Sequence, residues 1–258
     1  MSYAAWLAVL SAGVFLLERL APARPAQRAL RPGLGWDVVY LVFNGHLLGV
    51  ALAAAFAATV GPALDASGVA GLVDRRWVAG WPLAAQAAAA VVLLDFVEWN
   101  VHRLLHGVPA LWRFHQVHHS VRDGEMDWIV SFRFHWAEAV VYKAAKYVPL
   151  ALLGFSGDAL MVHAVLGTLV GHLNHANLDW GHGLWRYVLN NPRMHLWHHD
   201  ADAREARNFG IILSAWDWLF GTASVPDHPP RRLGFRGDDV VPRDFLRRSL
   251  WPLRLGAT

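Results

Sequence analysis

Two carboxylates and two imidazoles occur at helical spacing between residues 94 and 120. At about 100° per residue, Asp95, Glu98, His102 and His106 fall within an arc of roughly 80° on one helical face. Imidazole and carboxylate groups are ligands for divalent metal ions. A single pair of histidines four residues apart is, however, more often a hydrogen-bonded surface or core pair. This face therefore does not predict a metal site by itself.

Histidine triplets at i, i+3, i+4 spacing make the metal interpretation much stronger. One triplet follows this face directly, the segment NPRMHLWHHD repeats its spacing, and GHLNHANL adds two more histidines; the residues are His115, His118, His119, His195, His198, His199, His172 and His175. Buried imidazoles each require a polar partner, so packing does not readily explain two such triplets. Their number exceeds what one ion needs. The sequence predicts convergent helical faces around two metal ions.

These segments resemble the fatty acid hydroxylase and sterol desaturase superfamily of membrane di-iron oxygenases. DFVEWNVHRLLHGVPALWRFHQVHHS is similar to its first two histidine boxes, and NPRMHLWHHD followed by NFG and WDWLFGT to its third box and trailing signature. FRFHWAE resembles the arginine, histidine and glutamate element after the second box, and HANL the lone histidine between boxes. The resemblance covers residues 94–222, with all boxes in order.

The resemblance implies a ligand set and a chemistry. The implied metal ligands are His102, His106, His115, His118, His119, His175, His195, His198 and His199. Either His172 or His135 is expected to supply a further ligand. Imidazole accepts iron, zinc, copper and nickel alike; the resemblance selects two iron ions, which zinc can replace in a purified sample, with O2 as co-substrate. The expected reaction is hydroxylation of a lipid C–H bond, with desaturation as a variant.

Composition places the chain in a membrane. Of its 258 residues 55% are hydrophobic and only 17% charged, which is apolar for a soluble protein. We expect spans at residues 3–20, 38–60 and 83–101, and a hairpin at 137–171 that either crosses fully or is re-entrant. The first run lacks a preceding Lys or Arg and is followed by Arg19, Arg24, Arg28 and Arg31, which favours a retained helix over a signal peptide. The same arginines predict that residues 21–36 are cytosolic.

This topology places the histidine boxes on the cytosolic face. We expect an all-α, single integral membrane domain (1–258), with N-terminal membrane helices at 1–93, a cytosolic helical cap in the histidine core at 94–222, and a basic cytosolic tail at 223–258. A bacterial inner membrane is the expected location, or the endoplasmic reticulum in a eukaryote. Residues 61–81 form an outer loop.

Four polar residues are expected to support the ligands. Asp95 and Glu98 lie in the last turns of a predicted span, where ionisable groups are costly and usually functional, and they could accept hydrogen bonds from ligand imidazoles. Asn177 and Asn208, in the HANL and NFG segments, are expected in the same role. No protein acid or base is assigned.

Several functions are excluded or disfavoured. The chain has no cysteine, which excludes disulfides, Cys-ligated iron–sulfur clusters and thiolate zinc sites. Electrons must come from an external donor of the ferredoxin, cytochrome b5 or reductase type. A nucleic-acid partner is not expected. A haem electron carrier and a divalent-metal transporter stay as alternatives, but haem does not need HxxHH triplets, and a transporter needs ligands near the bilayer midplane.

Overall fold

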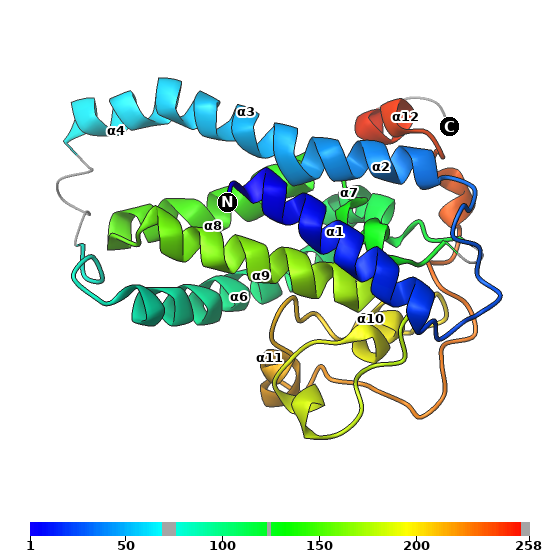
Figure 1. The fold of residues 1–258 in the computed structure, drawn as a ribbon. Helices are drawn as coiled ribbons and strands as arrows, with labels where there is room; N and C mark the ends of the chain where they lie inside the picture. The colour runs from blue at the N-terminus through cyan, green and yellow to red at the C-terminus, as the bar shows by residue number, and fades with distance from the viewer. Residues whose placement is uncertain (69–75, 123–124, 254–258) are drawn as a thin grey trace.

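Helices make up the regular structure of this computed structural model, which describes residues 1–68, 76–122 and 125–253 (Figure 1). In those residues no strand forms, and β pairing is limited to isolated bridges at Leu189–Leu213 and Asp200–Leu233. The all-α prediction is confirmed. Parts of the expected outer loop (69–75) and the end of the tail (254–258) lie outside the described residues, as do residues 123–124.

Three helices are long and apolar enough to cross a membrane. They are α1 (Tyr3–Leu20), a 30-residue helix at Leu34–Ala63, and α6 (Leu83–Gly107). The middle one runs through α2 (Leu34–Val42) and α3 (Leu48–Ala55) into the first residues of α4 (Gly61–Ser67), with π-helical turns at Phe43–Leu47 and Phe56–Val60 between them. Two of the three exceed the predicted spans. Helix α6 continues six residues past Val101 because the next helix breaker is Pro109.

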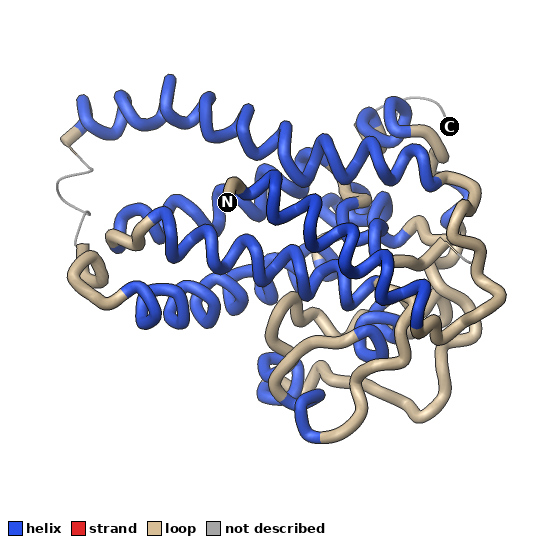
Figure 2. The backbone as a smooth tube through the Cα atoms, in the orientation of Figure 1, coloured by secondary structure: helices blue, strands red, loops and turns tan. Residues whose placement is uncertain are grey.

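The expected hairpin is a pair of long helices. Helix α8 (Trp136–Leu153) and helix α9 (Gly157–His175) pack against α6, and α9 also packs against α1 (Figures 1 and 2). Their turn requires glycine: Gly154 has φ +82°, and a Cβ there would lie 2.8 Å from Arg76 Cα. Buried apolar residues from α6, the turn and α9, including Leu94, Phe155 and Ala159, form the core at this end.

Short helices gather at the opposite end of the bundle. Helix α7 (Pro109–His119) follows α6 after Val108, and α10 (Pro192–His198) lies near the C-terminal end of α9 (Figure 1). Both begin with proline, whose missing N–H costs nothing in a first turn. The Asn191 side chain caps α10 by accepting from Met194 N at 3.1 Å. Helices α7 and α10, which carry the histidine triplets, therefore lie beside the C-terminal ends of α6 and α9, which carry further histidines.

The described part of the tail packs against this end. Val241 joins Tyr40 of α2 and Val117 of α7 in a buried cluster, and α12 (Phe245–Leu250) packs on α2. Arg122 donates to the carbonyl oxygens of Asp238 and Val241 at 2.6 and 2.8 Å. Residues 223–253 are therefore a cover for the histidine end of the bundle.

Buried ion pairs tie the 21–36 connection to the histidine end. Arg133 contacts both oxygens of Asp37 at 2.6 Å and Glu125 at 2.9 Å. Arg31 contacts both oxygens of Asp127 at 2.7 Å and reaches Asp37 at 2.8 Å. The Arg133 and Asp37 side chains are 1% and 0% exposed. Because its two arginines share Asp37, the network holds α2 against the loop after α7.

Removing this shared carboxylate should destabilise the protein strongly. Asp37→Asn leaves two buried guanidinium groups short of a counter-charge, and breaking a buried pair from one side costs about 3–5 kcal/mol of unfolding free energy. Thermal unfolding in detergent measures the loss. Asp179→Asn is the matched control, because the Asp179–His182 pair is 67% and 60% exposed and such pairs contribute about 0–1 kcal/mol. Equal stability of the two variants would contradict this role.

Candidate metal centre

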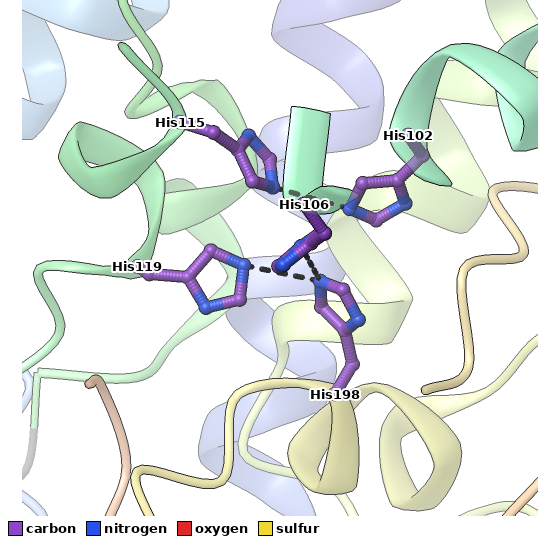
Figure 3. Close-up of side chains that lie close together, drawn as sticks. All are labelled: His102, His106, His115, His119 and His198. Atoms are coloured by element: carbon purple, nitrogen blue, oxygen red, sulfur yellow. Dashed lines mark hydrogen bonds between the residues drawn. The ribbon is translucent and has the colours of Figure 1, made fainter. Parts of the chain in front are cut away.

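Nine imidazoles form two compact groups at the end of the bundle. The first group contains His102, His106, His115, His119 and His198 (Figure 3), and the second contains His118, His175, His195 and His199. Within each group, one nitrogen from every ring lies within 4.8 Å of the others. The nine residues are those that the resemblance implied, and they come from α6, α7, α9 and the α10 segment.

Each histidine triplet is divided between the groups. In α7, His115 and His119 face the first group while His118 faces the second. In the α10 segment, His198 faces the first group while His195 and His199 face the second. The rings of His119 and His199 stack at 4.2 Å between centroids, which places the groups side by side. Each triplet with i, i+3, i+4 spacing thus contributes histidines to both of two adjacent groups.

Hydrogen bonds at Nδ1 set the tautomers of several rings. Four imidazoles donate to main-chain carbonyl oxygens: His102 to Phe209 at 2.8 Å, His118 to Arg133 at 3.2 Å, His175 to Gly171 at 2.8 Å and His198 to Arg207 at 2.7 Å. A fifth ring, His115, has its Nδ1 3.0 Å from Glu138 Oε1. In a neutral ring the proton on Nδ1 leaves Nε2 with a bare lone pair.

Those lone pairs point at one another. His102 Nε2 lies 3.2 Å from His115 Nε2 in the first group, and His118 Nε2 lies 3.2 Å from His175 Nε2 in the second. His118 and His175 both carry their proton on Nδ1, so this pair has no hydrogen to share. Two buried lone pairs at this distance repel each other unless a cation lies between them. The second group therefore fits a metal ion on this observation, and the first group fits one by the same chemistry, because His102 and His198 also present unprotonated Nε2 atoms.

Burial keeps these imidazoles neutral. It lowers the pKa of His115, His118 and His119 well below their ordinary value of 6.5, and the neighbouring imidazoles lower it further. The same causes act on the α10 segment, where the pKa of His195, His198 and His199 is lowered. Neutral imidazole is the form that binds metal ions.

The two groups differ in access. A pocket of about 300 Å³ reaches His106, His119 and His198 of the first group, between Trp112 and Phe235. The four rings of the second group are all buried. Catalytic metal sites keep an open position whereas structural sites are closed. The first group is thus the one with room for a small molecule.

The remaining predicted ligands lie outside both groups. His172 lies between Ser11 Oγ, 3.1 Å from its Nε2, and Ser131 Oγ, 2.8 Å from its Nδ1. His135 contacts Ser249 O at 3.0 Å through Nε2, and its Nδ1 accepts from Ala137 N. Both nitrogens of each ring are therefore engaged: those of His172 link α9 to two other segments, and those of His135 contact Ser249 and the backbone two residues further on.

The four expected supporting residues also have other partners. Asp95 accepts from Ile212 N at 2.6 Å and Leu213 N at 3.0 Å, while Glu98 pairs with Lys146 and lies 3.4 Å from His163. Asn177 bridges to Arg24, and Asn208 to the carbonyl oxygens of Met194 and Ser224. Asp95, Asn177 and Asn208 thus satisfy buried backbone N–H and C=O groups, which need partners, whereas Glu98 joins α6 to the side chains of α8 and α9.

Glu138 and Asp217 hold the first group instead. Glu138 contacts His115 directly. Asp217 accepts from Phe209 N at 2.9 Å and Gly210 N at 2.8 Å, and so fixes the loop whose carbonyl orients His102. The signal for Glu138 is present in the FRFHWAE segment: a carboxylate at the start of an apolar helix needs a buried partner. Asp217 lies between aromatic residues in the AWDWLF segment, and nothing in its sequence neighbourhood predicts that it holds the metal-binding loop.

Acid should destabilise the metal-free protein. Unfolded histidines take up protons below about pH 6.5, whereas the depressed pKa values keep the folded imidazoles neutral, so the unfolded state binds more protons and stability falls as pH falls. The thermal midpoint of chelator-treated protein should drop between about pH 7.5 and about pH 5.5. A thermal midpoint that stays constant or rises as the pH is lowered would show that the imidazoles of the folded protein are already charged.

Comparison with known proteins agrees with the architecture of this site. Residues 87–222 match the family model described as fatty acid hydroxylase. An ornithine lipid hydroxylase of Rhizobium tropici is 34% identical over 179 residues, which cover 68% of this chain and 53% of that protein. Human alkylglycerol monooxygenase is 29% identical over 136 residues, which cover 52% of this chain and 29% of that protein. Methylsterol monooxygenase 1-2 of Arabidopsis thaliana is 20% identical over 142 residues, which cover 54% of this chain and 47% of that protein.

The chain spans about half or less of the length of the curated relatives it matches. No solved structure matches it. The family model covers more than half of the chain and contains all nine grouped histidines. The chain therefore belongs to the fatty acid hydroxylase family.

Proposed function

We propose that this chain is an integral membrane, non-haem di-iron oxygenase that hydroxylates a C–H bond of a lipid, with desaturation as a variant. The observation that carries the proposal is that unprotonated Nε2 atoms converge in both imidazole groups: those of His102 and His198 in the first, and the facing pair of His118 and His175 in the second. Two groups provide two metal positions, and the stacked His119 and His199 rings make them neighbours. The nine grouped histidines are the proposed ligands, and His135 and His172 are not included.

Iron is the proposed metal because the family's named relatives include hydroxylases and monooxygenases. Bound iron would supply O2 activation, with electrons from an external donor of the ferredoxin, cytochrome b5 or reductase type. Imidazole also binds zinc well, so zinc can replace iron during purification. The chain has no cysteine with which to build an iron–sulfur relay of its own.

The protein's own residues hold and shield this centre. The carbonyl oxygens of Phe209, Arg133, Gly171 and Arg207 keep four Nε2 atoms unprotonated and aimed inward. Glu138 Oε1 lies 3.0 Å from His115 Nδ1, and such a carboxyl partner fixes the orientation of a ligand imidazole. The closed second group excludes water, and the pocket beside His106 leaves space for O2 at the first.

The proposed substrate is a lipid in the same membrane. The relatives are named for ornithine lipid, alkylglycerol and methylsterol, so fatty acyl chains, ether lipids and sterols are all candidates. The arginines that follow α1 favour a cytosolic location for the histidine end, because short cytoplasmic loops are enriched in Lys and Arg. We infer a bacterial inner membrane, or the endoplasmic reticulum in a eukaryotic host.

Metal content and oxygen transfer test the assignment together. His198→Ala removes a ring from the first group and His118→Ala one from the second, so each variant should lose iron from one position and fail to add oxygen from labelled O2 to extracted lipids. Elemental analysis and mass spectrometry measure both effects. His182→Ala is the control because its side chain is 60% exposed and outside both groups. Undiminished iron in both site variants, or a haem absorption band, would contradict the proposal.

Glu138 should tune the affinity of the first group. Glu138→Ala leaves His115 Nδ1 without its acceptor, and loss of such a partner typically weakens metal binding about 10–100-fold. Glu138→Gln should retain most of the affinity, because an amide oxygen accepts the same hydrogen bond. Competition with a chromogenic chelator measures the affinities, with the exposed Glu205→Ala as control. Equal affinity of Glu138→Ala and the unsubstituted chain would remove Glu138 from the centre.

A further inference from the structure

An exposed apolar surface lies outside the three candidate spans. Its residues come from the Leu184–Tyr187 turn and the end of α11 (Ala215–Leu219), and we call it the aromatic surface; they are Leu184, Trp185, Tyr187, Val188, Leu189, Trp218, Leu219 and Phe220. Leu184 is 82% exposed, Trp185 74% and Leu219 70%. Soluble proteins rarely expose apolar residues in contiguous groups of this kind. This surface needs an apolar partner.

The two segments of the aromatic surface form one rigid unit. The Tyr187 and Trp218 rings pack at 4.7 Å, and Trp218 Nε1 donates to the Arg186 carbonyl oxygen at 2.9 Å. Ser214 N donates to Val188 O at 3.0 Å, and Asn190 N to Ile212 O at 2.9 Å. These backbone groups are satisfied within the protein, which hydrocarbon surroundings demand.

This unit is attached to the middle of α6. Asp95 accepts from Trp216 Nε1 at 2.9 Å as well as from Ile212 N and Leu213 N. The Phe96 ring lies 4.9 Å from Trp216 and 6.1 Å from Phe220. Helix α11 therefore lies beside α6 (Figure 1). Along the axis of α6, helix α11 lies level with Asp95 and Phe96.

That level falls inside the hydrocarbon core. Asp95 lies about 18 Å along the helix axis from Leu83, whereas the hydrocarbon core is about 30 Å thick. With Leu83 at the outer boundary, Asp95 is about 12 Å short of the inner one. Arg103, whose guanidinium lies 4.6 Å over the Trp99 ring, reaches that boundary. Any tilt of α6 places Asp95 deeper still.

The aromatic surface also continues the outward face of α6. Val92, Leu93 and Phe96 are 46%, 47% and 36% exposed, and Phe96 contacts the α11 segment. On a membrane-spanning helix such residues face lipid. One apolar surface thus runs from α6 through Phe96 onto the loop segments. Arg186 stays compatible with it, because its guanidinium bonds to the Tyr187 hydroxyl and its long stem can extend to the headgroups.

We propose that the aromatic surface is immersed in the cytosolic leaflet and contacts acyl chains. The inference goes beyond the oxygenase assignment and requires only that α6 crosses the bilayer with its histidine end at the cytosolic face. It makes residues 184–189 and 218–220 the membrane-embedded part of the histidine core. Asp217 connects this part to the first imidazole group, since it accepts from Trp99 Nε1 at 3.0 Å and holds the Phe209 loop.

Single-cysteine labelling tests this immersion without any turnover assay. The chain has no cysteine, so Leu184→Cys and Leu219→Cys each create one thiol for an environment-sensitive fluorophore. Leu93→Cys on α6 is the lipid-facing reference, and Glu205→Cys, whose native side chain is 80% exposed, is the aqueous reference. The labelled proteins are reconstituted into phosphatidylcholine vesicles, and thermal unfolding of each variant in detergent, compared with the unsubstituted chain, checks that it is folded.

Nitroxide-labelled acyl chains should remove most of the fluorescence at positions 184 and 219, as at 93, while aqueous iodide quenches only position 205. Iodide quenching at 184 and 219 equal to that at 205 would overturn the proposal. Protection from both quenchers would also overturn it, because the surface would then be covered by a second copy of the chain. If position 93 also escaped the nitroxide lipid, the membrane placement of α6 itself would fail, which separates that result from a failure of the immersion alone.

Discussion

Mutual repulsion between unprotonated nitrogens is the constraint on which this structure depends. His118 faces His175, and the hydrogen that could bridge their two Nε2 atoms is held at Nδ1 on both rings. Such an arrangement is costly in a metal-free fold and favourable with a cation in place. The surrounding structure must hold rings that would otherwise move apart. The close packing of α6, α7, α9 and the α10 segment supplies this restraint.

Carboxylates stabilise the centre mainly from a distance. Asp217 and Asp95 hold the 209–216 loop, and Asp37 joins the two arginines that fasten α2 to the loop after α7. Only Glu138 touches a grouped imidazole among these four. Neutral ligands with few charged neighbours would leave a bound metal ion strongly positive, and such an ion attracts small electron-rich molecules. The acidic side chains thus set geometry, while the imidazoles set the charge of the site.

Much of this organisation follows from sequence pattern, and the rest depends on packing. Hydropathy predicted the three long helices, the repeated HxxHH spacing predicted that histidine faces converge, and the resemblance to a known family implied which nine histidines take part. On a helix His118 points about 60° away from His115 and about 100° away from His119. The pattern could not show that two separate groups lie in these directions, because their other histidines come from α6, α9 and the α10 segment. It also assigned Asp95 to an imidazole, whereas the folded chain uses that carboxylate for two backbone N–H groups. Long-range partners such as the 209–216 loop leave no local periodicity.

The choice of carbonyl oxygens as partners for His102, His118, His175 and His198 affects how the protein can change over evolutionary time. A main-chain oxygen is present whichever residue occupies the position, so substitutions at 133, 171, 207 and 209 leave the acceptor in place as long as the backbone path is kept. The tautomers of these rings are inherited with the fold. Sequences can therefore diverge widely around the centre, as relatives at 20–34% identity do, without redesigning the orientation of its rings.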